Sequence, residues 1–536
     1  MTTPASESSS FSQQKVSQPS VGHSAILVAA GIFLSRIAGL VRDRVFSHFF
    51  GLSAAADAFR AAMRIPNVLQ NLLGEGVLSA SFIPVYAKLM AQSEKEEAGR
   101  VAGVVLSFLA LATSVLVLVG VAAAPWLIDA IAPGFHGETR MLTIQLVRIL
   151  FPGVGMLVFS AWCLGVLNSH RKFFLSYASP VVWNAVLVAT MLLFGRHSDL
   201  PRLAVYTAWG SVVGSGLQFL VQLPVVFAVA PALRFSLRRS RENVQVVVTN
   251  FIPAFLSRGV AQLSAYVDAF LASYLPTGAV ASLSNAQTLY MLPVSLFGMS
   301  ISAAELPGMS ETLGNEQEVA EALRKRLALS TRRIGFFVVP SAVAFLALGD
   351  IVSAAIYQTG KFTHADALYV WGILAGSAVG LVASTIGRLY SSAYYALRDT
   401  RTPLRFAVIR VVLTTGLGYL AALRLPGLLG IDSSWGVAGL TASAGFSAWV
   451  EFLLLRRGMD RRIGITKFPT LEFFKLWSCA VTAALVAWGV KLWLQPHRPW
   501  IAALLILVPY ALIYLALTAL MGINQAASLA RRLIRR

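Results

Sequence analysis

Charge and cysteine are both scarce in this sequence. Only 13% of the 536 residues are charged, 57% are hydrophobic, and there are two cysteines. Because Cys163 and Cys479 both fall in apolar segments far apart in the chain, we expect them to pack in the interior rather than form a disulfide. A single soluble core cannot account for a chain that is this long and this apolar.

Several motifs of catalysis and metal binding are also missing. The chain has no Walker lysine loop, no His-Glu-x-x-His, no paired Cys-x-x-Cys and no Gly-x-Ser-x-Gly. We therefore expect neither an enzyme nor a protein with a cofactor or a metal site. Because a nucleotide site is also missing, any transport must be driven by the gradient of the substrate, a coupling ion or the membrane potential.

Long apolar segments make up most of the chain. Windows of about 20 residues or more are long enough to cross a bilayer as helices, and they predict an all-α polytopic membrane protein with about 14 transmembrane helices. The windows lie at residues 25–50, 58–90, 101–128, 141–168, 174–195, 203–230, 247–275, 280–308, 334–357, 366–395, 405–423, 434–455, 474–494 and 499–522. Residues 1–21 are rich in Ser and Gln and predict a disordered cytoplasmic tail without a cleavable signal peptide.

The net charge is +20. The distribution of the basic residues along the chain indicates membrane topology and not nucleic-acid binding. If the amino terminus is cytoplasmic, Lys and Arg gather in every second connection, which is the positive-inside pattern. The basic connections are at 88–100, 171–172, 234–241, 324–333, 398–405, 456–467 and 531–536. The pattern requires an even number of spans, and it predicts that both termini lie in the cytoplasm.

Charged residues recur inside the first two apolar windows. Arg36, Arg42, Asp43 and Arg44 interrupt the first window, and a polar series follows at spacings of 3, 4, 3, 4 and 4: Asp57, Arg60, Arg64, Asn67, Asn71 and Glu75. This spacing forms one stripe along a helix, about 27 Å long. An arginine at mid-membrane costs about 2.5–3.5 kcal/mol, so we expect the stripe to line a water-filled cavity. The alternative is that Arg44 and Arg60 lie at a membrane edge and reach out to water.

A weak internal repeat divides the chain. Arg36 and Arg258 each follow a serine at similar depth in the first and seventh windows, and Asp57 and Asn285 open similar segments in the second and eighth. The repeat predicts two pseudo-symmetric six-helix lobes around a central cavity, plus two extra C-terminal helices. The predicted parts are the tail at 1–21, an N-lobe at 22–230, a C-lobe with cytoplasmic links at 231–455, and the last two helices with a basic tail at 456–536.

Three motifs between residues 35 and 84 resemble those of the MurJ/MviN family of lipid II flippases. They are Ser-Arg-Ile-Ala-Gly-Leu-Val-Arg-Asp at 35–43, Ala-Asp-Ala-Phe at 56–59 followed by Ile-Pro-Asn-Val-Leu at 65–69, and Gly-Glu-Gly-Val-Leu-Ser-Ala-Ser-Phe-Ile-Pro at 74–84. The resemblance covers nearly the whole chain from about residue 22. It implies a fold of the multidrug/oligosaccharidyl-lipid/polysaccharide (MOP) exporter superfamily.

The resemblance also implies a substrate. The family flips lipid II, the undecaprenyl-diphosphate-linked disaccharide-pentapeptide used to build peptidoglycan, from the inner to the outer leaflet by alternating access. Arginine suits a diphosphate because its planar guanidinium pairs with two oxygens and never loses its charge. The implied diphosphate-binding cations are Arg36, Arg42 and Arg64, with Asp43, Asp57, Glu75, Arg60, Asn67 and Asn71 as gating or supporting residues. Alternatively, the acidic residues form buried ion pairs that only hold helices together.

The sequence departs from the family pattern in both lobes. Gln70 stands near the position where the family shows a basic residue, and Thr288 replaces the arginine of an aspartate-arginine pair. We therefore expect Arg258 to supply the cation of the second lobe. Arg388 and Arg410 are further arginines within apolar windows, and each is equally well explained as a membrane-interface residue.

Other functions remain as alternatives to lipid II transport. The chain is also compatible with an exporter of drugs or of another polyprenyl-linked saccharide, and with a membrane scaffold that transports nothing. An arginine-lined cavity argues against the scaffold, which does not need to bear the cost of burying charge. The two final helices favour a groove for a lipid tail over an exporter of soluble drugs.

Overall fold

The structure is a computed structural model that is helical throughout the part of the chain it describes. It describes residues 21–73, 77–78, 81–231, 233, 244–245, 247–249, 251, 266–310, 316–397, 399–494, 498–523 and 525–526. Within these ranges β pairing is limited to one isolated bridge, between Thr359 and Phe362. Residues 1–20 of the predicted tail, Glu75 and Arg258 lie outside the described residues.

The first half of the chain forms an amino-terminal bundle. Its helices are α1 (Val21–Phe50), α2 (Ala54–Leu73), α4 (Ile83–Ala91), α5 (Lys95–Ala122), α6 (Ala124–Ile131), α7 (Gly137–Ser169), α8 (Phe173–Ala178), α9 (Pro180–Phe194) and α10 (Leu200–Val229). Proline stands in the first turn of α4, α6, α9 and α10, where a missing N–H leaves no hydrogen bond unmade. Helix α7 packs against α2, α5 and α10 and is the most buried helix of this bundle.

The second half forms a carboxy-terminal bundle. Its elements are α12 (Ala279–Pro293), the π-helix η1 (Val294–Met299), α13 (Ser300–Ser310), α14 (Glu316–Ala347), α15 (Gly349–Tyr357), α16 (His364–Ala378), α17 (Leu381–Ala396), α18 (Arg401–Tyr419), η2 (Leu420–Arg424), α19 (Leu425–Leu429), η3 (Ser433–Trp435), α20 (Gly436–Ile463), α21 (Thr470–Leu494) and α22 (Pro499–Leu520). The last two helices pair with each other and pack on α14 and α15, where Tyr510 and Tyr514 donate hydrogen bonds to carbonyls of α14.

The described helices match most of the predicted spans. Nine spans are long and apolar enough to cross a membrane, and α16 with α17, bent by 44°, makes a tenth. The first, second and eighth windows correspond to α1, α2 and α12–η1–α13, and the seventh lies largely outside the described residues. The predicted all-helical, many-spanning fold is confirmed, whereas the count of fourteen remains a prediction.

Two predicted spans differ from the structure in detail. The window at 334–357 is two helices, because α14 ends at Ala347 and α15 begins at Gly349. The window at 366–395 is bent where α16 meets α17, next to Gly380, whose backbone lies directly against Gly445 of α20. Hydropathy cannot reveal such breaks, because both sides of each break are equally apolar.

The close packing at this bend predicts a loss of stability. A Cβ atom on Gly380 would lie 2.4 Å from the Cα atom of Gly445, so Gly380→Ala forces the backbones apart. We expect destabilisation of about 1–3 kcal/mol, seen as a lower melting temperature of the purified protein. Gly416→Ala is the control, because nothing lies within 4 Å of a Cβ atom there. Equal melting of the Gly380→Ala variant and the parent would contradict the close approach.

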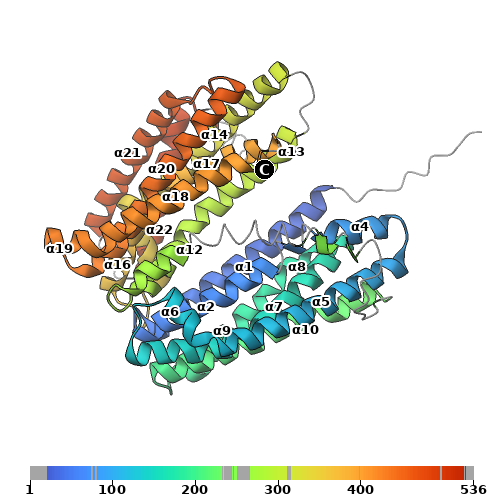
Figure 1. Ribbon diagram of the computed structural model, residues 1–536. Helices are drawn as coiled ribbons and strands as arrows, with labels where there is room; N and C mark the ends of the chain where they lie inside the picture. The colour runs from blue at the N-terminus through green and yellow to red at the C-terminus, as the bar shows by residue number, and fades with distance from the viewer. Residues whose placement is uncertain are drawn as a thin grey trace, which may run out of the picture.

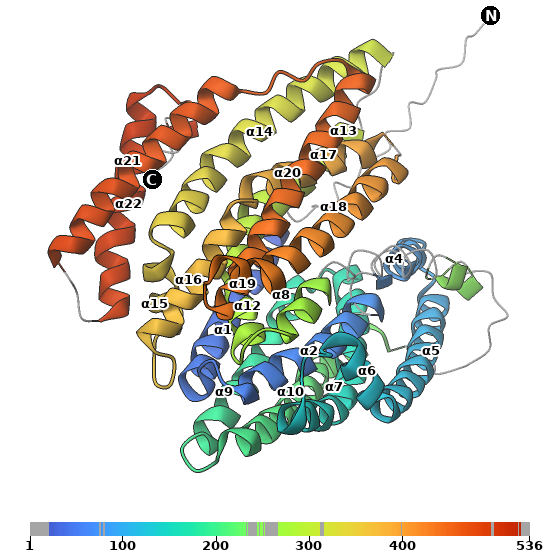
Figure 2. The same ribbon diagram turned by 60° about the vertical axis from the view of Figure 1, so that its left-hand side comes forward.

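The two bundles lie side by side and touch at one end (Figures 1 and 2). We call this region the closed end; it brings residues 44–60 and 134 against residues 273–285 and 355–361. Lys361 N donates to His48 O at 2.9 Å, and His48 Nδ1 lies 2.9 Å from Thr359 Oγ1. Backbone and side-chain hydrogen bonds therefore join the bundles where α1 ends and α15 leads into α16.

Candidate functional site

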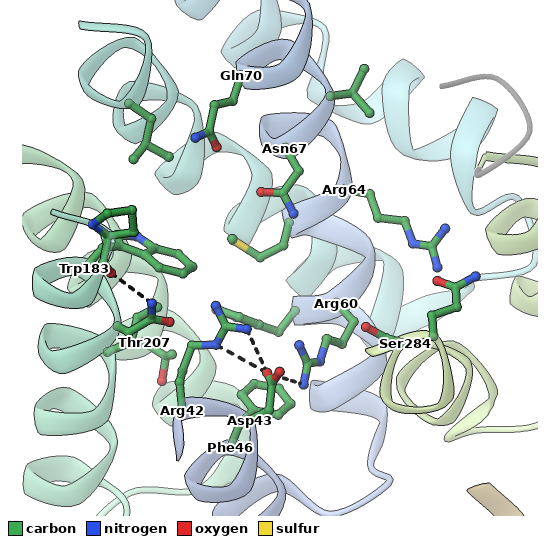
Figure 3. Close-up of a pocket in the computed structure, with 18 of the residues that line it drawn as sticks. Arg42, Asp43, Phe46, Arg60, Arg64, Asn67, Gln70, Trp183, Thr207 and Ser284 are labelled. Carbon is green, nitrogen blue, oxygen red and sulfur yellow. Dashed lines mark hydrogen bonds and ion pairs between the residues drawn. The ribbon is translucent and has the colours of Figure 1, made fainter. Parts of the chain in front are cut away.

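A cavity of about 460 Å³ lies along α1 and α2 (Figure 3). Its lining comes from α1, α2, α7, α9 and α10 of the first bundle and from α12 of the second, so both bundles contribute to one space. The polar and aromatic lining residues include Arg42, Asp43, Phe46, Arg60, Arg64, Asn67, Gln70, Trp183, Asn184, Thr207, Gln218, Tyr266, Ser284 and Gln287. An apolar protein therefore encloses a polar, cationic cavity, as the sequence predicted.

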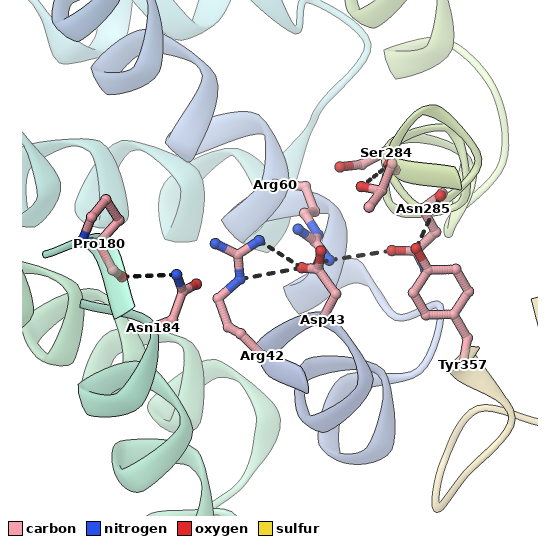
Figure 4. A network of polar contacts seen from close by, with 9 residues as sticks. Arg42, Asp43, Arg60, Pro180, Asn184, Ser284, Asn285 and Tyr357 are labelled. Carbon is pink, nitrogen blue, oxygen red and sulfur yellow. Dashed lines mark hydrogen bonds and ion pairs between the residues drawn. The ribbon is translucent and has the colours of Figure 1, made fainter. Parts of the chain in front are cut away.

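The centre of the cavity is a carboxylate shared by two guanidinium groups (Figure 4). Asp43 Oδ1 accepts hydrogen bonds from Arg42 Nη2 at 2.9 Å and from Arg60 Nη2 at 3.1 Å. The Asp43 side chain is only 3% exposed, whereas that of Arg42 is 23% exposed. Two positive charges on one negative charge leave the cluster with a net charge of +1, which suits an anionic ligand.

Aromatic rings hold both guanidinium groups. Arg42 lies over the ring of Trp183 at 5.1 Å, and Arg60 lies over Phe46 at 4.5 Å. Trp183 is itself fixed by a hydrogen bond of 3.2 Å from its Nε1 to the carbonyl of Ser211. Stacking orients the planar groups and partly compensates for their loss of water. Among the described residues, the buried Arg60 Nε has no hydrogen-bond acceptor.

The described part of the α2 stripe continues along the cavity. Arg64 and Asn67 line it, together with Gln70. Arg64 is close enough to Asp268, from the segment before α12, for their charges to interact. The helix that carries Asn71 is described, but its side chain and all of Glu75 are not. Of the predicted stripe, Arg60, Arg64 and Asn67 therefore line the cavity on one helical face.

Two predicted diphosphate-binding residues are not placed in this cavity. Arg36 is exposed on α1 and does not line the cavity; it lies seven residues, or about 10 Å, before Asp43 on the same face of the helix. Arg258 lies outside the described residues. Thr288, at the position of the missing arginine, donates to the carbonyl of Ser284 within its own helix. Binding by Arg36 and Arg258 remains a prediction.

Asp57 joins the two bundles at the closed end. Its carboxylate accepts hydrogen bonds from Gly278 N at 2.6 Å and from Ala281 N at 2.7 Å. These N–H groups belong to the amino terminus of α12, which favours a negative charge. Gly278 has φ of +93°, a conformation that glycine adopts readily. Asp57 therefore caps a helix of the other bundle.

A second contact at the closed end links the cavity to the bundle interface. Arg60 Nη2 donates to Asn285 Oδ1 at 3.2 Å as well as to Asp43. The carbonyl of Asn285 accepts from the hydroxyl of Tyr357, which is fully buried, at 3.1 Å (Figure 4). The guanidinium that holds Asp43 therefore also reaches across to the second bundle.

Arg44 and Arg60 both have partners within the protein, whereas their position relative to a membrane edge stays a prediction. Arg44 Nη1 donates to the carbonyls of Ala355 and Ile356 at 2.6 and 3.0 Å, near the carboxyl end of α15, where a positive charge is favourable. Arg60 is in the central cluster, with 13% of its side chain exposed. The sequence could not show this, because both partners of Arg44 are backbone atoms about 310 residues away.

The remaining intramembrane arginines have different surroundings. Arg410 of α18 pairs with Glu451 of α20 at 3.0 Å, so it joins two helices and is not a simple interface residue. Arg388 is exposed on α17. No sequence pattern predicted several other polar or aromatic residues of the cavity, including Trp183, Asn184 and Gln218. Each is a single polar or aromatic residue in an apolar segment, so no spacing pattern marks it.

The architecture matches solved membrane transporters of the MOP superfamily. An inward-facing multidrug resistance MATE family transporter of that superfamily matches with a TM-score of 0.63 and 18% identity, over 82% of this chain and 98% of that chain. A structure described as lipid II flippase MurJ in an inward closed conformation matches with a TM-score of 0.76 and 24% identity, over 93% of this chain and 99% of that chain. The chain thus has the fold of these multi-pass transporters, with two bundles around a polar cavity.

Sequence comparison identifies the family. The family model described as "Lipid II flippase MurJ" matches residues 46–522. The chain is 31% identical over 484 residues to the lipid II flippase MurJ of Burkholderia cenocepacia, covering 89% of this chain and 90% of that protein. It is 29% identical to the probable lipid II flippase MurJ of Haemophilus influenzae, covering 92% of this chain and 98% of that protein. The chain belongs to the MurJ family of lipid II flippases, and the predicted resemblance is confirmed.

Proposed function

We propose that this protein moves lipid II from the inner to the outer leaflet of the bacterial cytoplasmic membrane for peptidoglycan synthesis. The observation that carries the proposal is the cluster of Arg42 and Arg60 around Asp43, in a cavity lined by both bundles. Family membership supports the substrate, since relatives are named for it. A diphosphate group supplies the two adjacent anionic sites that such a cluster can bind.

Binding is proposed to proceed by exchange of partners at the cluster. Arg42 is the more exposed of the two guanidinium groups and presents its free N–H edge to the cavity. A diphosphate at this edge draws Arg42 toward itself, while Asp43 remains paired with Arg60. Arg64 and Asn67 continue the polar surface along α2 and supply further contacts to the phosphate or the saccharide. Asp43 thus prevents repulsion between the arginines before the ligand arrives.

Gating is proposed to depend on the closed end. Alternating access requires the contacts of Asp57 with the amino terminus of α12 to break when the cavity opens there. Exposure to water compensates for the lost hydrogen bonds, because a carboxylate and free N–H groups are both well hydrated. Arg60 contacts both Asp43 in the cluster and Asn285 in the second bundle. A shift of this side chain therefore couples ligand binding at the cluster to opening of the closed end.

The closed end is proposed to face the outside of the cell. Its connections at 132–136 and 358–363 hold one basic residue, Lys361, whereas the connections at the other end of the helices are rich in Lys and Arg. Single cysteines in a Cys163→Ala, Cys479→Ala background are expected to react with an impermeant thiol reagent in intact cells at Asp432→Cys but not at Arg461→Cys. The reverse pattern would overturn this orientation and the proposed cytoplasmic termini.

Complementation tests the proposed substrate directly. Expression of the chain in a strain depleted of its own lipid II flippase is expected to restore growth. Lipid II is also expected to become accessible to an impermeant enzyme that cleaves it from outside. Failure of both readouts, with the protein present at normal level in the membrane, would contradict lipid II transport and favour another polyprenyl-linked saccharide.

A further inference from the structure

A second hollow lies on the outer surface of the amino-terminal bundle, apart from the central cavity. It measures about 1200 Å³ and is lined by the start of α2, by α7 and by the first turns of α10, with Pro125 of α6 at its edge. We call it the lateral groove. Its lining includes Ser53, Ala55, Glu138, Arg140, Met141, Gln145, Arg148, Pro201, Val205 and Trp209. None of the residues that line the groove also lines the central cavity.

The groove faces away from the bundle. Met141, Gln145 and Arg148 follow each other at spacings of four and three on α7, so they share one helical face, and all three are exposed. The Met141 side chain is 70% exposed and Trp209, across the groove on α10, is 53% exposed. In a protein that crosses a membrane, an apolar surface that faces outward is covered by lipid.

Arg148 is an unusual residue for this surface. It lies eleven residues, or about 16 Å, from the start of α7, within a helix that is apolar enough to span a membrane. Among the described residues, no ion pair or hydrogen bond engages its side chain. The neighbouring Arg140 is different, since it makes two hydrogen bonds to Asp129, at 2.7 and 2.8 Å, and these lower the pKa of that carboxyl group.

The charges along α7 have a definite order. Glu138 stands in the first turn of α7, and Arg148 follows about 15 Å farther along the helix axis. The charged groups of Glu138 and Arg148 can lie closer together than their positions on the helix axis, because both side chains are long and arginine reaches toward the headgroup level. The Asp129–Arg140 pair is neutral overall. The groove therefore presents the negative charge of Glu138 near the start of α7 and the unpaired positive charge of Arg148 farther along the helix. The amino terminus of α2, at Ser53 to Ala55, adds partial positive charge.

We propose that the lateral groove binds a glycerophospholipid with an ammonium headgroup, such as phosphatidylethanolamine. Its phosphate contacts Arg148, its ammonium group lies toward Glu138, and its acyl chains cover Met141 and Trp209. The order of charges matches this headgroup, in which the phosphate lies deeper in the bilayer than the ammonium group. An unpaired guanidinium at this depth is costly, and a lipid phosphate provides the missing partner. The bound lipid is distinct from the transported substrate, because the groove opens away from the central cavity.

Native mass spectrometry of the full-length protein in detergent tests this site. Phosphatidylethanolamine is titrated into the parent, Arg148→Ala, Glu138→Gln and the control Arg202→Ala, an exposed arginine at the start of α10 outside the groove. We expect Arg148→Ala to weaken binding of the most tightly held lipid about tenfold, which is the loss of one charge-assisted contact. Arg202→Ala is expected to bind as the parent does. Equal affinity of Arg148→Ala and the parent would overturn the proposal.

Two further lipids identify the ligand. Phosphatidylglycerol lacks the ammonium group, so Glu138→Gln is expected to remove the preference of the parent for phosphatidylethanolamine over it. A parent with no such preference would overturn the assigned headgroup. If undecaprenyl diphosphate displaces phosphatidylethanolamine from the parent but not from Arg148→Ala, the groove holds the transported lipid and the proposal is wrong. Lipid II transport by Arg148→Ala is expected to be retained, so failure here differs from failure of the proposed transport function.

Discussion

Replacing Arg42 with alanine is expected to reduce lipid II transport by about 10- to 100-fold, which corresponds to one or two lost charge-assisted contacts. Arg42 is the more exposed guanidinium of the cluster, and alanine removes its bonds to Asp43 together with its contact on Trp183. Arg42→Lys is expected to retain part of the activity, because it keeps the charge but loses the planar fork. The measurement is lipid II accessibility to an impermeant enzyme in depleted cells.

Comparison with Arg36→Ala shows whether transport depends on an arginine in the cavity or on positive charge anywhere along α1. Arg36 is exposed on the same helix but does not line the described cavity, so its replacement is expected to have the smaller effect. Arg202→Ala serves as an exposed control, and the level of each variant in the membrane is measured by immunoblot. If Arg42→Ala transports lipid II as well as the parent, the cluster is not the diphosphate site.

Joining the two bundles at the closed end is expected to stop transport completely and reversibly. His48 Nδ1 and Thr359 Oγ1 lie 2.9 Å apart on opposite bundles, so cysteines at these positions are within reach of a short cleavable thiol crosslinker. The background is Cys163→Ala, Cys479→Ala. Alternating access requires this contact to separate in each cycle, so the crosslinked protein should be inactive and a reductant should restore activity.

A crosslink within one bundle controls for the chemistry. Asp129 and Arg140 make a contact of 2.7 Å on α6 and α7 of the amino-terminal bundle, and cysteines at these two positions should crosslink without loss of transport. Normal transport by the His48→Cys, Thr359→Cys protein after complete crosslinking would show that the closed end does not open. That result would contradict alternating access.

The helical membrane fold and the cationic face of α2 followed from the sequence. Apolar windows of spanning length require helices, because only intrahelical bonds satisfy the backbone in lipid. The regular spacing of Arg60, Arg64 and Asn67 places them on one face of α2, and that face must turn away from lipid. These three side chains do line the cavity. The motif pattern also predicted the family, which the sequence comparisons confirm.

The partners of those charges were decided by the tertiary structure. Arg44 bonds to carbonyls of α15, and Asp57 caps α12, more than 200 residues away in each case. Such contacts involve backbone groups, which every residue carries, so no side-chain pattern in the sequence marks them. The bend beside Gly380 likewise depends on where Gly445 of another helix lies. The sequence by itself determined that the charges of α2 turn toward the protein interior, because that depends on the free energy of transfer of each side chain. Which groups they meet depends on the packing of helices far apart in the chain, and only the folded structure decided it.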